Sequence, residues 1–228
     1  MPRRARIIIP NMPHHIFQRG FDLREVFVNR AAYAYYLNNL REWTRKLGIK
    51  VYGYCLMTDR VHLIIEPGDQ VASVSELMKR LAAGQTRYIN SLTSRIGPLW
   101  ASRYKISAID REDYLLECCR YIELNPVLAR IVNRAEDWEW SSYRSRIGIG
   151  EASWLECDST YLALGSGDEE RRKRYREFIA EGVGNRQEII KNALGRNQLT
   201  GSRRFIDEVE LRMGVRVEYR GRGRPGPA

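Results

Sequence analysis

Two β-rich runs lie close together in the first third of the chain, and a helical pattern flanks them on each side. The runs at 49–57 and 61–66 are separated by Thr-Asp-Arg and closed by Pro-Gly, so they predict a β-hairpin. Apolar residues recur at three- to four-residue spacing over 30–47, and Gly48 stands where a helix cap is expected. A second stripe of the same spacing covers 74–92.

One further strand is predicted on each side of this core. The run from His14 to Gly20 follows Pro13, and the run at 103–109 follows a Gly-Pro break. The complete order is therefore β-α-β-β-α-β. This order predicts an α+β, ferredoxin-like fold, with one antiparallel sheet and the helices packed on one face.

The segment D-R-E-D-Y-L-L-E-C-C-R-Y-I-E-L-N-P follows the last strand and reads as one helix. Asp110 can cap its first turn, and Pro126 cannot continue it, so we expect it to end near Asn125. Tyr121 and Asn125 stand one i,i+4 step apart, beside the apolar stripe. Helix geometry alone therefore holds a phenol and an amide together.

Composition indicates a folded protein with a polyanionic partner. The 228 residues carry a net charge of +10, which favours nucleic acid. Four cysteines without a CxxC pair argue against both a disulfide framework and a zinc site. No apolar run has the length of a membrane span, and the apolar stretch near the N-terminus is too short for a signal peptide. We expect a cytoplasmic, nucleoid-associated protein that contacts no membrane.

Loop-like glycines at 148–150 predict a boundary, after which 169–180, 186–194 and 203–213 read as short helices. The expected organisation is a first domain at 1–150, a helical region at 151–215 and a disordered basic tail at 216–228. We expect the tail to follow DNA phosphates or to enter a minor groove. The predicted DNA contacts are Arg19, Arg60, Arg103, Lys105, Arg222 and Arg224.

The second strand of the predicted hairpin carries a histidine, His62. Side chains alternate along a strand, so positions 60 and 62 share a face. The third strand is central in a ferredoxin-like sheet, and the helix that carries Tyr121 and Asn125 can cross that face. Such a set suits single-stranded DNA cleavage, in which a divalent metal polarises a phosphate and tyrosine attacks phosphorus to give a 5′-phosphotyrosine bond.

The chain resembles the REP-associated tyrosine transposases, which belong to the single-tyrosine HUH transposases. The matching motifs are H-H-I-F-Q-R-G at 14–20, Y-C-L-M-T-D-R-V-H-L-I at 54–64, L-W-A-S-R-Y at 99–104 and R-Y-I-E-L-N-P-V-L-A-R-I-V at 120–132. The resemblance implies that 1–150 is a catalytic domain that recognises hairpin DNA and cleaves and rejoins an adjacent single strand. By the same resemblance Tyr121 is the nucleophile, and His62 and Asn125 are ligands of Mg²⁺ or Mn²⁺.

Arg60 departs from the family pattern, because it stands where the first metal histidine is expected. A guanidinium has no lone pair to give to a metal. The sequence leaves four outcomes open: a weakened site of His62, Asn125 and water; replacement by His14 or His15; DNA binding without cleavage, as a repressor or structural partner; or a direct contact between Arg60 and the scissile phosphate. Of these outcomes we expect a weakened or lost metal site first. We expect the protein to be a monomer or a homodimer.

Overall fold

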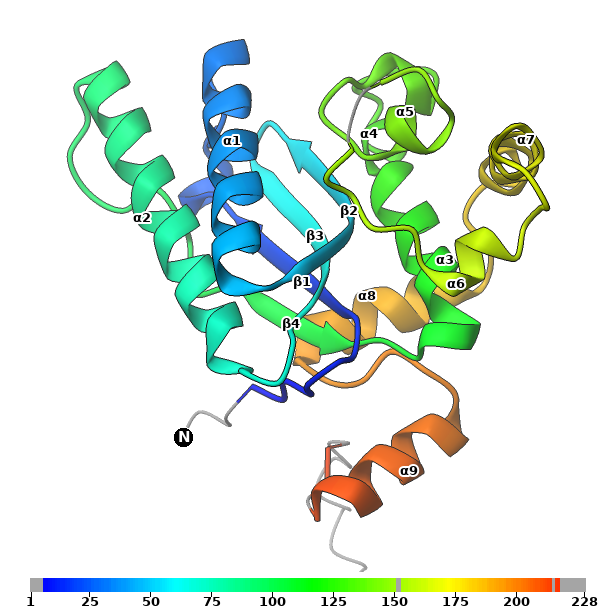
Figure 1. Cartoon of the computed structure of the whole chain (residues 1–228). Helices are drawn as coiled ribbons and strands as arrows, with labels where there is room; N and C mark the ends of the chain where they lie inside the picture. Colours follow the sequence, from blue (N-terminus) through cyan, green and yellow to red (C-terminus); the bar gives the residue numbers. More distant parts are fainter. Residues whose placement is uncertain (1–5, 151–152, 215, 218–228) are drawn as a thin grey trace, which may run out of the picture.

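The computed structural model describes residues 6–150, 153–214 and 216–217. Its centre is a four-stranded sheet of order β2-β3-β1-β4, in which every neighbouring pair is antiparallel (Figure 1). The strands are β1 (His14–Arg19), β2 (Lys50–Met57), β3 (Arg60–Glu66) and β4 (Lys105–Ala108). The predicted hairpin is formed by β2 and β3, and β3 and β1 are the central strands.

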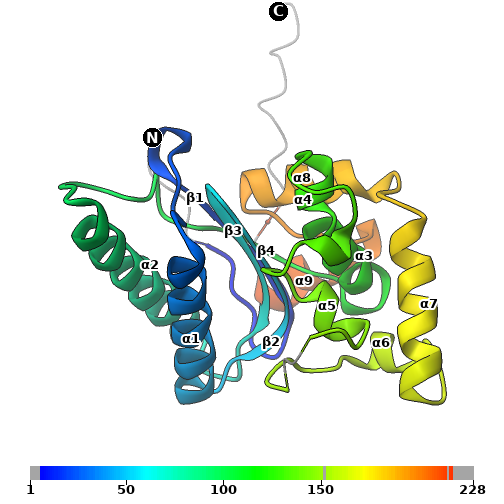
Figure 2. The same cartoon turned by 90° about the horizontal axis from the view of Figure 1, so that it is seen from above.

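Helices α1 (Arg30–Leu47) and α2 (Ala72–Thr93) pack on one face of the sheet (Figure 2). The Asn29 side chain caps α1 by accepting from the Ala32 amide, and Gly48 ends it in the left-handed region at φ 62°. The apolar stripes of both helices bury against strand residues such as Ile16 and Leu63. The βαββαβ order, the α+β class and the position of these two helices are as predicted.

A third helix, α3 (Arg111–Glu123), covers the opposite face of the sheet (Figure 2). Its Cys118 and Ile122 lie in one cluster with Cys55 of β2 and Ile64 of β3. The helix ends two residues before the expected end, and a short helix, α4 (Asn125–Leu128), follows it directly. Pro126 lies in the first turn of α4, where a missing N–H costs nothing because that group has no partner within the helix.

The prediction that the Asp110 side chain caps the first turn of α3 was wrong. This side chain makes no capping hydrogen bond to α3. Instead, Oδ2 of Asp110 accepts from Oγ of Ser202 at 3.3 Å. Thr200 lies alongside, with its carbonyl accepting from the Asp110 amide at 2.8 Å. The start of α3 is therefore held by residues from far along the chain.

The segment after α4 returns to the edge of β2. It contains the 3-10 turn η2 (Ala135–Asp137) and the short helix α5 (Tyr143–Arg146). Another 3-10 turn, η1 (Phe21–Leu23), lies earlier in the chain, directly after β1. Nε1 of Trp138 donates to the Leu56 carbonyl at 2.9 Å, and the Leu56 amide donates to the Trp140 carbonyl at 2.9 Å. Both tryptophans pack against the core beneath α1, as expected.

In the described part of the chain four more helices follow, and three of them were predicted. They are α6 (Ser159–Leu162), α7 (Asp168–Ala180), α8 (Arg186–Arg196) and α9 (Arg203–Met213). Helix α8 contacts β4, α3 and β1, and its Ile190 joins the cluster beneath α3. The division at residue 150 stays a prediction, and Arg222 and Arg224 lie outside the described residues. None of the described helices is long and apolar enough to cross a membrane.

Candidate functional site

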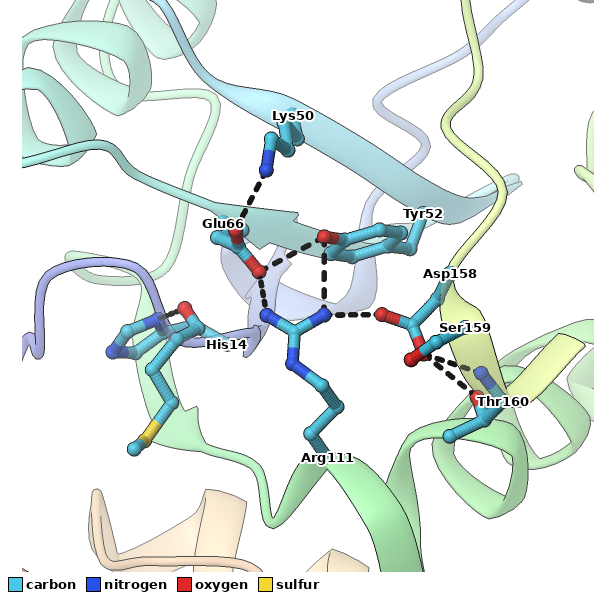
Figure 3. Close-up of polar contacts among 9 residues, drawn as sticks. His14, Lys50, Tyr52, Glu66, Arg111, Asp158, Ser159 and Thr160 are labelled. Carbon is cyan, nitrogen blue, oxygen red and sulfur yellow. Dashed lines mark hydrogen bonds and ion pairs between the residues drawn. The ribbon is translucent and has the colours of Figure 1, made fainter. Parts of the chain in front are cut away.

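The N-terminal end of α3 is fixed to the sheet by Arg111 (Figure 3). Its guanidinium binds Glu66 of β3 and Asp158, and Nη1 also donates to the Tyr52 hydroxyl at 3.3 Å. Tyr52 donates in turn to Oε2 of Glu66 at 2.9 Å. Burial acts to raise the pKa of Glu66, but hydrogen bonds from Tyr52, Arg111 and Lys50 outweigh it and lower that pKa below its ordinary value.

The C-terminal end of α3 is fixed by a buried carboxylate. Glu123 is fully buried and accepts from Ser142 Oγ at 2.5 Å and from the Tyr175 hydroxyl at 2.7 Å. Nε of Arg146 lies 3.5 Å from the same carboxylate. Burial raises the pKa of Glu123 against the opposing effect of Arg146 and the two hydroxyls. Helix α3 is thus held at both ends, and this fixes the position of Tyr121 between them.

The sheet face beneath α3 carries two histidines in contact. In the β1–β3 register His15 lies opposite Ile64 and Phe17 opposite His62, so all four share that face. Nε2 of His15 and Nδ1 of His62 are 2.9 Å apart. The Tyr121 ring meets both edge-on, with centroid distances of 5.8 Å to His15 and 6.0 Å to His62. The predicted approach of Tyr121 to His62 is present in the structure.

Burial keeps these histidines neutral. It lowers the pKa of His15 to about 3. It also lowers the pKa of His62 well below its ordinary value, with further lowering from His15 and Arg60. The pKa of Tyr121 is raised by burial, and the positive charge of Arg60 opposes this rise. At neutral pH the site therefore holds two uncharged imidazoles and a protonated phenol.

A pocket of about 370 Å³ opens beside Tyr121, between the sheet and α8. Its lining comes from the strands, from α3 and α4, and from α8. The lining residues are Phe17, Arg60, His62, Lys105, Tyr121, Asn125, Lys191, Asn192, Leu194, Gly195 and Arg196. Four of them are basic and none is acidic, so the pocket presents positive charge.

Arg60 and Asn125 each have one local partner and one group left for the pocket. Nε and Nη2 of Arg60 donate to the Asp59 carboxylate at 2.7 and 2.9 Å, and no described residue accepts from Nη1. Nδ2 of Asn125 donates to the Tyr121 carbonyl at 2.8 Å, which leaves the amide oxygen for another partner. Both residues line the pocket with Tyr121.

The donor atoms at this site do not fit a resident Mg²⁺ or Mn²⁺. These ions prefer several oxygen ligands, carboxylates above all, whereas the side chains that line the pocket offer two amide oxygens, one phenol, one imidazole and no carboxylate, beside four cationic groups. No group of three or more His, Cys, Asp or Glu side chains suited to a metal ion occurs in the described part of the chain. His14 cannot supply the missing ligand, because its ring nitrogens are engaged by the Met12 carbonyl and the Ile9 amide.

The structure brings Tyr121, His62 and Asn125 together, as predicted, and places Arg60 and Lys105 in the same pocket. The roles of these residues stay predictions. Arg19 and Arg103 are exposed and do not line the pocket. The sequence reasoning missed His15 as the partner of His62, and it missed the basic residues of α8. No local pattern marks either feature, because each depends on which elements meet across the fold.

The fold and site together are thus an antiparallel sheet crossed by the helix that carries Tyr121, with a basic pocket beside that tyrosine. The family described as "Transposase IS200 like" matches residues 10–125, just over half of the chain. The protein therefore belongs to the IS200-like transposase family.

Two solved structures are similar to the chain. One is a REP-associated tyrosine transposase bound to a REP hairpin, with a TM-score of 0.55, 16% identity, and coverage of 69% of this chain and 99% of that chain. The other is a protein from Deinococcus radiodurans R1 assigned as a transposase, with a TM-score of 0.37, 17% identity, and coverage of 60% and 98%. No curated protein sequence matches the chain. The family match and the first of these structures confirm the predicted resemblance and fold.

Proposed function

We propose that the protein binds a DNA hairpin and presents the adjoining single strand to Tyr121, which cleaves and rejoins that strand. The observation that carries the proposal is the convergence of Tyr121, His62, Asn125 and Arg60 in one basic pocket. Pockets with this charge attract phosphate, and guanidinium N–H groups match phosphate oxygens.

The proposed reaction is a transesterification. The Tyr121 hydroxyl loses its proton to solvent as its oxygen bonds to phosphorus, and the bond from phosphorus to the 3′-oxygen breaks. The 3′-oxygen takes up a proton, which leaves a free 3′-OH and a 5′-phosphotyrosine. Rejoining is the reverse reaction with a 3′-OH as nucleophile. Arg60 opposes the rise in the pKa of Tyr121 that burial causes, so its charge favours the tyrosinate.

The hairpin is proposed as the recognition element because of the likeness to a transposase solved with a REP hairpin. The net charge of +10 is consistent with binding to a DNA backbone. Cytoplasmic residence with DNA as the partner belongs to the same proposal.

The experiment incubates the protein with hairpin oligonucleotides that carry single-stranded extensions, in EDTA and in Mn²⁺. A covalent protein–DNA adduct on a denaturing gel is the expected product. Tyr121→Phe should abolish it, because phenylalanine has no nucleophilic oxygen. Tyr88→Phe is the matched control and should leave it unchanged, since Tyr88 stacks on Tyr35 between α1 and α2. An adduct that persists in Tyr121→Phe would rule out Tyr121 as the nucleophile.

A second candidate function is DNA binding without cleavage, as a repressor or structural partner at hairpin sites. Arg60 favours it, because a guanidinium stands among the groups that the resemblance assigns to a metal. In this case the wild type forms no adduct but still binds hairpins, and Arg60→His forms an adduct in Mn²⁺. Adduct formation by the wild type in EDTA would exclude this candidate.

A further inference from the structure

The charged groups of the pocket come from elements on two sides of it. Arg60 belongs to β3 and Lys105 to β4, whereas Lys191 and Arg196 belong to α8. Lys105 Nζ donates to the Gly195 carbonyl at 2.7 Å, which ties β4 to the end of α8. No Asp or Glu lies among the lining residues of the described chain. Such a lining repels a dication and attracts an anion of phosphate size.

The hydrogen bond between His15 and His62 determines whether the His62 nitrogen that faces the pocket carries a proton or a lone pair. Nδ1 of His15 is buried and has no hydrogen-bond partner among the described residues. If His62 donated from Nδ1, His15 would accept at Nε2 and would carry its own proton on this partnerless Nδ1. Buried N–H groups without an acceptor are rare and costly. The reverse arrangement, in which Nε2 of His15 donates, leaves only an unpaired lone pair at Nδ1.

In the favoured arrangement His62 accepts at Nδ1 and carries its proton on Nε2. Because His15 occupies Nδ1 and His62 lines the pocket, Nε2 is the nitrogen that remains for a ligand. A protonated Nε2 has no lone pair for a metal. It can instead donate a hydrogen bond to a phosphate oxygen.

Helix α8 lies beyond the segment that matches the family, which ends at residue 125. Buried Ile190 and Leu194 anchor α8 against the rest of the fold. Lys191 and Arg196 are exposed and line the pocket. Two basic side chains from outside the family segment therefore line the pocket beside Tyr121.

We infer that the pocket is a metal-independent binding site for a phosphate of single-stranded DNA, formed by Arg60, the Nε2–H of His62, and Lys191 and Arg196 of α8. The inference rests on the proposed function in taking DNA as the ligand. It adds that α8 belongs to the site and that Arg60 and His62 bind the phosphate directly as donors.

Binding is measured by fluorescence anisotropy in EDTA, over a series of salt concentrations. One labelled oligonucleotide is a hairpin alone, and the other carries a single-stranded extension. The extension should tighten binding in EDTA. Lys191→Gln and Arg196→Gln should each weaken binding of the extended oligonucleotide and lower its salt slope by about 0.7, the contribution of one single-strand phosphate contact. Binding of the hairpin alone should not change.

The matched control is Lys79→Gln, because Lys79 is exposed on α2, on the opposite face of the sheet. It should bind both oligonucleotides as the wild type does. Circular dichroism verifies that each variant is folded. An extension that tightens binding only in Mg²⁺ or Mn²⁺, or α8 variants that bind as the wild type does, would overturn the inference while hairpin binding stands. Failure of both oligonucleotides to bind at low salt would overturn the proposed function as well.

A second measurement determines, in the absence of DNA, which ring nitrogen of His62 carries the proton. In a long-range ¹H–¹⁵N spectrum of the free protein at pH 7, His62 should show a protonated Nε2 and an unprotonated Nδ1. The reverse pattern would mean that His62 turns a lone pair to the pocket, as a metal ligand does, and would overturn the assignment of His62 as a donor.

Discussion

His14 and His15 are adjacent in β1 but have different surroundings. His15 shares the α3 face with His62, whereas His14 binds the chain that leads into the strand. Nδ1 of His14 lies 2.7 Å from the Met12 carbonyl, and Nε2 accepts from the Ile9 amide at 3.0 Å. This arrangement needs a neutral ring with its proton on Nδ1. His14 therefore has a structural task that depends on its protonation state.

Acidification should destabilise the protein through His14. Burial lowers the pKa of His14 to about 4 in the folded state, against 6.5 ordinarily. Because the unfolded chain binds the proton more readily, the stabilisation is complete above pH 6.5 and is lost as the pH falls towards 4. Between pH 7 and pH 5 the loss is about 2 kcal/mol from this residue.

Urea unfolding of the wild type and of His14→Gln at the two pH values measures this effect. The variant should lose about 2 kcal/mol less than the wild type on acidification. Glu66 contributes little in this window, because its pKa is lowered from 4.5 and it titrates at more acidic pH. Equal losses in both proteins would show that His14 does not titrate differently in the folded and unfolded states.

At the scale of elements, α3 is held at its start by charged contacts in addition to its apolar stripe. The side chains of Glu66 and Asp158 are only 5% and 4% exposed, and Arg111 binds both. Removing the guanidinium leaves two buried carboxylates with fewer partners. The N-terminal turn of α3 then loses its main polar contact with β3.

Arg111→Met should therefore lower the free energy of unfolding by roughly 2–4 kcal/mol, somewhat below the usual cost of breaking a fully buried pair because Arg111 is partly exposed. Lys50→Met is the matched control. Lys50 binds the same Glu66 at 3.1 Å, but its side chain is 55% exposed, so the loss should stay below about 1 kcal/mol. Chemical denaturation measures both, and equal losses would contradict the special role of Arg111.

At the scale of the whole molecule, the C-terminal helices complete cores that begin earlier in the chain. Ile179 of α7 packs in a cluster with Ala135, Tyr143 and Ile147. Ile190 of α8 joins the cluster of α3 and the sheet. Burying each isoleucine contributes about 1.5–3 kcal/mol. That is a large fraction of the roughly 5–15 kcal/mol by which a domain is stable.

A fragment of residues 1–150 should consequently be much less stable than the complete chain, or unfolded at 37 °C. A fragment of residues 1–217, which keeps the buried Val217, is the control and should melt close to the complete chain. Thermal melts followed by circular dichroism compare them. A cooperative 1–150 fragment with an unchanged melting temperature would instead establish residues 1–150 as an independent domain.

The parts that the sequence predicted are those set by local patterns. Hydrophobic periodicity predicted α1 and the β2–β3 hairpin, and the spacing of Tyr121 and Asn125 predicted that they lie together. The contact between His15 and His62 depends on the β1–β3 register. Tertiary packing sets this register, so the sequence of either strand alone does not predict the contact. The approach of α8 to the pocket depends on long-range burial of Ile190, which no local spacing encodes.

The positions of the cysteines make their reactivity a measure of how the layer between the sheet and α3 opens. Cys55, Cys118 and Cys119 are buried in the layer between the sheet and α3, whereas Cys157 is exposed. A thiol reagent therefore reacts at Cys157 without any opening of the fold, and at the other three only when α3 lifts from the sheet. The labelling rate of these three thiols therefore measures how often the layer that holds Tyr121 opens, and no engineered probe is needed.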